Sequence, residues 1–167
     1  MNKNIVLVGF MGSGKTTIGK LLAQSLAWNF IDTDDIAIKK SGKTSAPEVF
    51  EQLGEIGWRK YESEAISELS KQTNLVISTG GGVITNSENI VNLKKGGHLV
   101  YLQTSFETIT SRLIGDTSRP LFTDIKIAHK LFETREPLYR ENSDWTLDTT
   151  LKTPAELCSE ILLSVSR

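Results

Sequence analysis

The sequence predicts an α/β fold in which a parallel β-sheet is covered by helices on both faces. Short apolar runs typical of buried strands alternate with segments whose apolar residues recur at helical spacing. The first run, residues 5–8, leads directly into Gly-Phe-Met-Gly-Ser-Gly-Lys-Thr at residues 9–16. This octapeptide fits the phosphate-binding pattern G-x-x-x-x-G-K-[ST], which requires a strand before it and a helix after it. We therefore expect a three-layer α/β/α domain.

Five strands and the helices between them follow from the same periodicity. The strand-like runs cover residues 5–8, 30–32, 75–78, 98–102 and 145–147. Helical patterns begin near Lys15 and cover residues 44–70, 86–95, 105–114, 125–135 and 154–163. Right-handed helical crossovers join neighbouring parallel strands in such folds. Because no repeat, low-complexity tract or linker interrupts the pattern, residues 1–167 are expected to form a single domain.

Two connections are longer than a simple crossover requires. Residues 34–70 form a mainly helical insertion, broken by Gly42, Pro47, Gly54 and Gly57. Residues 115–124 are polar and short of apolar anchors, which is typical of a mobile lid. In open α/β sheets the ligand lies beyond the carboxyl ends of the strands, so the residues after each strand are the candidates for function.

Composition excludes several classes of protein. The net charge of −1 gives no basic excess for nucleic acid or an anionic membrane, so neither partner is expected. The single cysteine, Cys158, cannot form an internal disulfide and lies in an apolar stripe typical of a core helix. No signal peptide or membrane-spanning stretch is recognisable, and a cytoplasmic location is expected.

The loop at residues 9–16 predicts a site for a nucleoside triphosphate. Its glycines allow the backbone to wrap an anion, and the N–H groups of the following helix point at it. Lys15 adds a positive charge, and Thr16 offers a hydroxyl to Mg²⁺. An ordinary glycine-rich turn would explain the glycines but not Lys15 and Thr16 in register.

Acidic residues follow the second predicted strand. On an extended backbone, Asp32 and Asp34 would face one side and Asp35 the other. Two carboxylates beside a triphosphate could hold Mg²⁺ through water and could orient or deprotonate an acceptor hydroxyl. The alternative is a helix N-cap cluster, which suits Asp35.

Three consecutive glycines, Gly80, Gly81 and Gly82, follow the third predicted strand. Their entropic cost is high and they offer no side chain for packing. They are therefore expected where the backbone approaches a ligand closely and presents unobstructed N–H groups. The alternative is a flexible turn, which would need only one or two glycines.

The remaining candidates are arginines and aromatic residues whose spacing leaves alternatives open. Arg59 and Glu62 could form a surface ion pair, and Phe50 and Trp58 could belong to the core. Arg119 lies in the predicted lid, where it could close on phosphate oxygens. For Arg112 and Arg135, each near a predicted helix end, a favourable interaction with the helix C-terminus is a sufficient alternative.

Together these segments resemble the shikimate kinases. The chain lacks the Asp-x-x-Gly and Asn-Lys-x-Asp elements of regulatory GTPases, which leaves phosphotransfer to a small molecule as the leading class. The resemblance is carried by six motifs in family order: the loop at residues 9–19, Asp32-Thr33-Asp34, Phe50 with Trp58-Arg59 and Glu62, Thr79-Gly80-Gly81-Gly82, Arg119-Pro120-Leu121, and Arg135-x-Pro137-Leu138-Tyr139.

The resemblance implies a fold like the nucleoside monophosphate kinases, with a five-stranded parallel sheet, a helical substrate-binding insertion and a lid. It implies ATP-dependent phosphorylation of the 3-hydroxyl of shikimate, on the route to chorismate and aromatic amino acids. The cofactors implied are ATP and Mg²⁺, and a monomer is expected.

The resemblance also assigns roles to matched positions. Catalysis would involve Lys15, Asp34 and Arg119, with Asp34 able to act as base. ATP would be bound by Gly12, Ser13, Gly14, Lys15, Thr16, Thr17, Arg112 and Arg119. Thr16 and Asp32 would hold the metal, Asp32 through water. Arg59 and Arg135 would bind the substrate carboxylate, and the other substrate contacts would be Asp34, Phe50, Trp58, Glu62, Gly80, Gly81 and Gly82.

Two other functions stay open on the sequence. A kinase acting on another small acceptor, such as a nucleotide or gluconate, would carry the same loop but would not need arginines placed for one carboxylate. A nucleotide-binding protein without catalytic activity could dispense with Asp34, which the chain retains.

Overall fold

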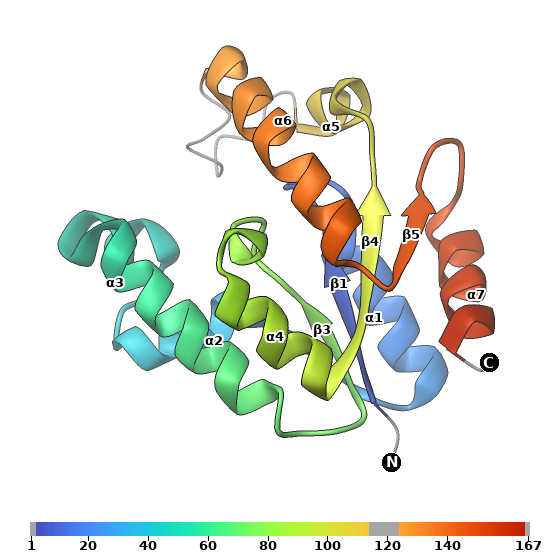
Figure 1. Cartoon of the computed structure of the whole chain (residues 1–167), viewed down its shortest axis with the longest axis horizontal. Coiled ribbons are helices and arrows are strands. Elements are labelled where there is room, and N and C mark those ends of the chain that lie inside the picture. Colours follow the sequence, from blue (N-terminus) through green and yellow to red (C-terminus); the bar gives the residue numbers. More distant parts are fainter. Residues whose placement is uncertain (1–2, 114–123, 166–167) are drawn as a thin grey trace.

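The computed structural model describes residues 3–113 and 124–165 (Figure 1). Five strands form one parallel sheet in the order β2-β3-β1-β4-β5. The strands are β1 (Asn4–Val8), β2 (Asn29–Asp32), β3 (Leu75–Ser78), β4 (Gly97–Gln103) and β5 (Trp145–Asp148). The five-stranded parallel sheet is confirmed, and each strand lies within one residue of its predicted bounds.

In the described residues, seven α-helices and one 3-10 turn connect or follow the strands. They are α1 (Lys15–Leu26), α2 (Thr33–Ser41), α3 (Ala46–Leu69), α4 (Ser87–Gly96), α5 (Phe106–Leu113), α6 (Ile125–Asn142) and α7 (Pro154–Val165), with η1 at Val83–Thr85. Within the described residues, no helix combines the length and apolar character needed to cross a membrane.

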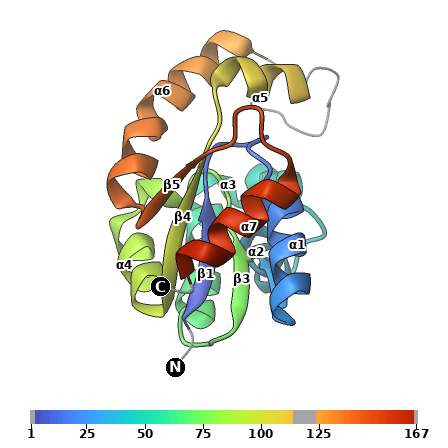
Figure 2. The same cartoon turned by 90° about the vertical axis from the view of Figure 1, so that its right-hand side faces the viewer.

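Two buried clusters hold the helices on opposite faces of the sheet. Ile5 and Leu7 of β1 pack with α1 and α7 in one cluster, which contains Cys158 as a small buried side chain. Val6 and Val8 of the same strand pack with α3, α4, α5 and α6 in the other. Figure 2 shows α7 lying across the first face. Alternate side chains of a fully buried strand thus produce the predicted three layers.

Two helices differ from the prediction. A separate helix, α2, begins at Thr33, immediately after β2, where the sequence suggested extended backbone. Helix α6 continues through Pro137 to Asn142 instead of ending near residue 135. The missing N–H of a proline normally destabilises a helix interior. Here Pro137 is exposed, while the side chains of Arg135 and Tyr139 on the same helix are buried.

The insertion between β2 and β3 is helical, as predicted, with one interruption in α3. Gly54 has φ 66° and ψ −175°, so it divides α3 into two helical segments. A positive φ of this kind is readily adopted only by glycine. Gly57 does not break the helix, and Pro47 lies in its first turn rather than interrupting it.

A buried asparagine fastens the start of β1 to the connection that precedes β3. Asn4 is fully buried; its amide nitrogen donates to the carbonyl of Gln72 at 2.9 Å, and its side-chain oxygen accepts from the N–H of Leu75 at 3.0 Å. Replacing Asn4 would leave those two backbone groups without partners.

We predict that Asn4→Ala lowers the free energy of unfolding by about 2–3 kcal/mol, because buried polar groups lose their hydrogen bonds. Urea denaturation measures this change. Asn29→Ala, at an exposed strand position, is the matched control and should change stability by less than about 0.5 kcal/mol. Equal effects of the two substitutions would contradict the role given to Asn4.

Candidate active site

A cavity of about 480 Å³ opens beyond the carboxyl ends of β1, β2 and β3. This is the edge at which ligands bind in open α/β sheets. The cavity brings together loop 9–16, the acidic residues after β2 and the glycines after β3. Its lining includes these predicted site residues: Gly12, Ser13, Gly14, Lys15, Thr16, Thr17, Asp32, Asp34, Gly80, Gly81 and Arg112.

The loop after β1 has the conformation that its glycines predict. Gly12 has φ 77° and Gly14 has φ 94°, both in the region that favours glycine. Gly14 is the N-cap of α1 and provides no side-chain cap, so the first N–H groups of the helix are available to an anion. Thr16 and Thr17 lie in that first turn and are exposed.

Lys15 folds back over the loop. Its Nζ donates to the carbonyls of Gly9 and Phe10, each at 2.8 Å, and to Ser13 Oγ at 3.3 Å. The side chain is only 9% exposed and lines the cavity. These contacts hold the ammonium group at the mouth of the loop, where the sequence predicts a phosphate.

Asp32 has the extended backbone that was predicted and caps the next helix, but the prediction is wrong for Asp34, which is helical. Asp32 is the N-cap of α2, and its carboxylate accepts a hydrogen bond from the N–H of Asp34 at 3.1 Å. Asp34 and Asp35 both lie in the first turn of α2. The capping interpretation therefore applies to Asp32 and not only to Asp35. The carboxylates of Asp32 and Asp34 nevertheless both line the cavity.

Asp34 is the most perturbed acid of the site. Its Oδ1 is buried and has no hydrogen-bond partner among the described residues. Burial, together with the nearby carboxylates of Asp32 and Glu62, raises the pKa of Asp34 to about 7, against an opposing effect of Lys15. Burial also raises the pKa of Asp32, partly offset by the hydrogen bond from Asp34 N–H. A carboxyl group with this pKa can accept a proton near neutral pH.

The three glycines allow two charged side chains to approach the backbone. A Cβ added at Gly80 would lie 2.6 Å from Asp34 Oδ1, and one at Gly82 would overlap the guanidinium group of Arg59. The N–H of Gly80 donates to Thr33 Oγ1 at 3.2 Å. The expectation that these glycines present free N–H groups is therefore wrong for Gly80. The expectation that they have no packing role is wrong for Gly80 and Gly82, which lie against Asp34 and Arg59.

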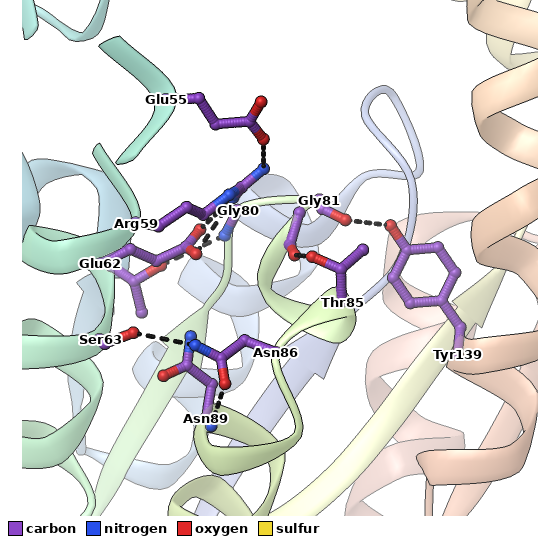
Figure 3. A network of polar contacts seen from close by, with 12 residues as sticks. Glu55, Arg59, Glu62, Ser63, Gly80, Gly81, Thr85, Asn86, Asn89 and Tyr139 are labelled. Atoms are coloured by element: carbon purple, nitrogen blue, oxygen red, sulfur yellow. Dashed lines mark hydrogen bonds and ion pairs between the residues drawn. The ribbon is translucent and has the colours of Figure 1, made fainter. Parts of the chain in front are cut away.

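Arg59 is held between two carboxylates (Figure 3). Its Nη1 lies 3.2 and 3.1 Å from the two carboxylate oxygens of Glu62, whose side chain is only 1% exposed. Its Nη2 donates to Glu55 at 3.1 Å, and the Glu55 side chain is 70% exposed. The pKa of Glu62 is raised by burial and held down by Arg59. The predicted Arg59–Glu62 ion pair thus exists, but it is buried on the Glu62 side.

Arg135 reaches the same region from α6. It lies seven residues before the end of the helix, so an interaction with the helix C-terminus does not account for it. The residue is 8% exposed, and its Nε has no hydrogen-bond partner among the described residues. Burial and the repulsion of Arg59 lower the pKa of Arg135, although an arginine remains charged.

The two aromatic residues of the insertion have different environments. Trp58 is 4% exposed and packs with Ala37 and Val49 in a small core cluster. Phe50 is 43% exposed and stacks on Trp58 with ring centroids 5.2 Å apart. Neither residue lines the 480 Å³ cavity, and neither do Arg59, Glu62, Gly82 or Arg135.

The loop between β5 and α7 supplies cavity residues that the sequence analysis missed. Thr149 and Lys152 of this loop, with Pro154 and Leu157 of the following helix α7, line the cavity. Arg112 lines it too and donates to the carbonyl of Gly12 at 3.2 Å. Lys152 is paired with Glu160 at 2.8 Å. Its position could have identified this loop as a candidate, because it follows a strand end, as the other site segments do.

Arg119 and residues 115–123 of the predicted lid lie outside the described residues.

The donor set of the cavity fits Mg²⁺. Within residues 3–113 and 124–165, no three or more His, Cys, Asp or Glu side chains are arranged to hold a metal ion. Mg²⁺ does not require such a cage, since it keeps several waters and binds one or two carboxylates plus phosphate oxygens. The hydroxyl of Thr16 and the carboxylate of Asp32 face the same cavity and are oxygen ligands of the right kind.

We predict that Asp34→Asn stabilises the free protein, and more so at higher pH. The pKa of Asp34 in the folded state lies above its ordinary value of 3.8, so ionisation of the buried group destabilises the fold. This cost is absent below about pH 4, grows with pH, and is complete above about pH 7. Thermal denaturation should show a gain in Tm of about 2 °C at pH 5 and about 5 °C at pH 8.

Asp35→Asn is the matched control for this measurement, since Asp35 is the exposed neighbour in the same helical turn. It should leave Tm nearly unchanged at both pH values. A gain for Asp34→Asn that does not depend on pH would contradict the perturbed pKa.

Known proteins resemble this chain in sequence and in architecture. The family model described as shikimate kinase matches residues 11–166. A shikimate kinase from Caldanaerobacter subterraneus is 44% identical over 163 residues, covering 96% of this chain and 94% of the relative. The solved structure of a shikimate kinase from Acinetobacter baumannii in complex with shikimate superposes with a TM-score of 0.92 at 38% identity, over 99% of this chain and 94% of that one.

A gluconokinase from Sinorhizobium meliloti also superposes, with a TM-score of 0.68 over 99% of this chain and 92% of that chain. At 20% identity this likeness shows a common fold and nothing about the acceptor. The curated relative, by contrast, is 44% identical over 96% of this chain, and the family model matches residues 11–166. On these grounds the chain belongs to the shikimate kinase family.

Proposed function

We propose that the cavity binds ATP and that Asp34 is the general base for the 3-hydroxyl of shikimate. As a member of the shikimate kinase family, the enzyme is an ATP-dependent kinase that phosphorylates shikimate. The observation that carries the residue assignment is the buried carboxylate of Asp34, which faces the same cavity as Lys15 and the phosphate loop.

The triphosphate would lie along the loop after β1. Backbone N–H groups of Gly12, Ser13, Gly14 and the first turn of α1 would surround it, and the Lys15 ammonium would exchange loop carbonyls for phosphate oxygens. Thr16 and Asp32 would hold Mg²⁺, which neutralises charge on the phosphates when it is bound. The base of the nucleotide would lie between Arg112 and the segment formed by Lys152 and the first residue of α7, Pro154.

The acceptor would lie between Asp34 and the two arginines. Both guanidinium groups suit a carboxylate, since their planar geometry allows two parallel hydrogen bonds. The Arg59 guanidinium packs against Gly82. Phe50 and Trp58 would form an apolar wall of the insertion. The backbone of Gly80 and Gly81, which lines the cavity, would contact the hydroxyls of the substrate.

Transfer then requires a proton to leave the 3-hydroxyl. As the hydroxyl oxygen bonds to the γ-phosphorus, the bond from that phosphorus to the β–γ bridging oxygen breaks, and the proton passes to the carboxylate of Asp34. Its pKa of about 7 suits this exchange near neutral pH. Positioning and charge neutralisation provide most of the acceleration in such reactions.

Arg119 is proposed to contact the γ-phosphate from the lid at residues 115–124. This assignment is supported by the Arg119-Pro120-Leu121 motif alone. We also propose that residues 1–167 act as one domain, as a monomer in the cytoplasm. The single, buried cysteine supports the cytoplasmic location, and sedimentation of the purified enzyme tests the monomer.

An acceptor panel tests the function. ADP release is measured with shikimate, nucleoside monophosphates, gluconate and no acceptor, with product identified by mass spectrometry. We expect turnover with shikimate alone, and its loss in Asp34→Asn purified in the same way. Turnover with a nucleotide or gluconate but not with shikimate would overturn the assignment. Absence of ADP release with every acceptor would indicate a nucleotide-binding protein without catalytic activity.

Glu55 accepts a hydrogen bond from Nη2 of Arg59, the nitrogen that a substrate carboxylate would need. Glu62 already fixes Nη1 through two short contacts, whereas Glu55 contacts Nη2 once and is largely exposed. Glu55 also follows the interruption of α3 at Gly54. We therefore expect the substrate carboxylate to displace Glu55 and leave Glu62 in place.

Glu55→Gln should accordingly lower KM for shikimate about two- to fivefold, the range that an exposed ion pair allows, with little change in kcat or in KM for ATP. Steady-state kinetics measure this directly. Glu51→Gln, at an exposed position of α3 before the interruption at Gly54, is the control and should have no effect. A raised KM in Glu55→Gln would mean that Glu55 orients Arg59 instead of competing for it.

A further inference from the structure

Tyr139 links α6 to the glycine turn at residues 80–82 without lining the cavity. Its hydroxyl donates to the carbonyl of Gly81 at 2.5 Å, between residues 58 positions apart in the chain (Figure 3). It lies one helical turn after Arg135 on α6, close enough for the charge of that arginine to act on its hydroxyl. A Cβ on Gly81 would lie 3.5 Å from the Tyr139 hydroxyl and 3.6 Å from the backbone nitrogen of Met11, so the glycine turn lies between Tyr139 and the phosphate loop.

The environment of Tyr139 keeps this connection rigid. The side chain is fully buried and stacks on Tyr101 with ring centroids 5.2 Å apart. Burial raises the pKa of Tyr139 far above its ordinary value, so the hydroxyl keeps the proton that it donates to Gly81. Removing this donor would leave the Gly81 carbonyl without its hydrogen bond and would lower the free energy of unfolding.

The neighbours of Gly81 explain why its position matters. Gly80 packs against Asp34 and Gly82 against Arg59, both at distances that leave no room for a side chain. A shift of the turn would therefore move the proposed base and one of the proposed carboxylate ligands. Arg135, the other proposed ligand, lies one turn before Tyr139 on α6.

We propose that Tyr139 is a positioning residue for the acceptor site: its hydroxyl holds the glycine turn in place beside α6, the helix that carries Arg135. It acts on shikimate through these groups and makes no contact with ATP. The proposal rests on the acceptor site described under the proposed function. It gives a role to the last residue of the Arg135-x-Pro137-Leu138-Tyr139 motif, which the reaction itself does not use.

Tyr101 provides a matched control. The two tyrosines stack on each other, both are buried, and each loses one hydroxyl when replaced by phenylalanine. The pKa of Tyr101 is raised to about 12 by burial, and the charged groups that act on it are Glu136 and Arg140, not Arg135 or the glycine turn. A purely structural role of Tyr139 would lower the stability of Tyr139→Phe without a selective rise in KM for shikimate.

Steady-state kinetics of Tyr139→Phe and Tyr101→Phe test the proposal, after thermal denaturation has shown that both variants are folded. We expect Tyr139→Phe to raise KM for shikimate about fivefold, as the loss of one buried hydrogen bond allows, and to leave KM for ATP within about twofold. Tyr101→Phe should change neither constant by more than about twofold. Equal shifts in the two variants, or a rise in KM for ATP as large as that for shikimate, would overturn the proposal.

A double-mutant cycle with Arg135→Lys adds a second measurement. If Tyr139 acts through Arg135 and the turn, the effect of Tyr139→Phe on KM for shikimate should shrink in the Arg135→Lys background. Full additivity would contradict that coupling. Absence of any shikimate turnover in the unmodified enzyme would refute the proposed function, whereas equivalent tyrosine variants would refute only this inference.

Discussion

The site is organised around a carboxylate that the fold removes from water. Asp34 lies in the first turn of α2, with one oxygen buried and without a hydrogen-bond partner among the described residues. Two further carboxylates, Asp32 and Glu62, lie close enough to raise its pKa. An isolated buried charge of this kind is costly, so its neighbours determine whether the group is charged or neutral. Lys15 and the proposed substrate and metal contacts are the groups that make the charged form favourable.

Each neighbour of Asp34 depends on a different part of the chain. Gly80 allows the backbone to pass beside the carboxylate, since any side chain there would collide with it. Glu62 is buried because Arg59 neutralises it, and Arg59 in turn lies against Gly82. The glycines after β3 therefore serve the charged side chains as much as any ligand. These glycines lose more conformational entropy on folding than other residues would, but they allow charged side chains from α2 and α3 to meet at the end of one strand.

How far the sequence predicts this arrangement depends on how local each signal is. The phosphate loop and the strands were predicted correctly, because spacing along a short segment determines them. The start of α2 was not, since Asp32-Thr33-Asp34-Asp35 is compatible with both extended backbone and a capped helix. The packing role of Gly80 and the contact between Tyr139 and Gly81 join distant segments, so no local pattern could reveal them. The loop after β5 was overlooked although its position alone made it a candidate.

The pH dependence of kcat/KM for shikimate tests the central claim most directly, because it reports the ionisation of the free enzyme. If Asp34 accepts the proton and its pKa is about 7, kcat/KM must rise with pH through that value and level off above it. The rise should disappear in Asp34→Asn, whose remaining activity would be low at every pH. A wild-type profile that is flat between about pH 5.5 and 8 would contradict a desolvated Asp34 as the base.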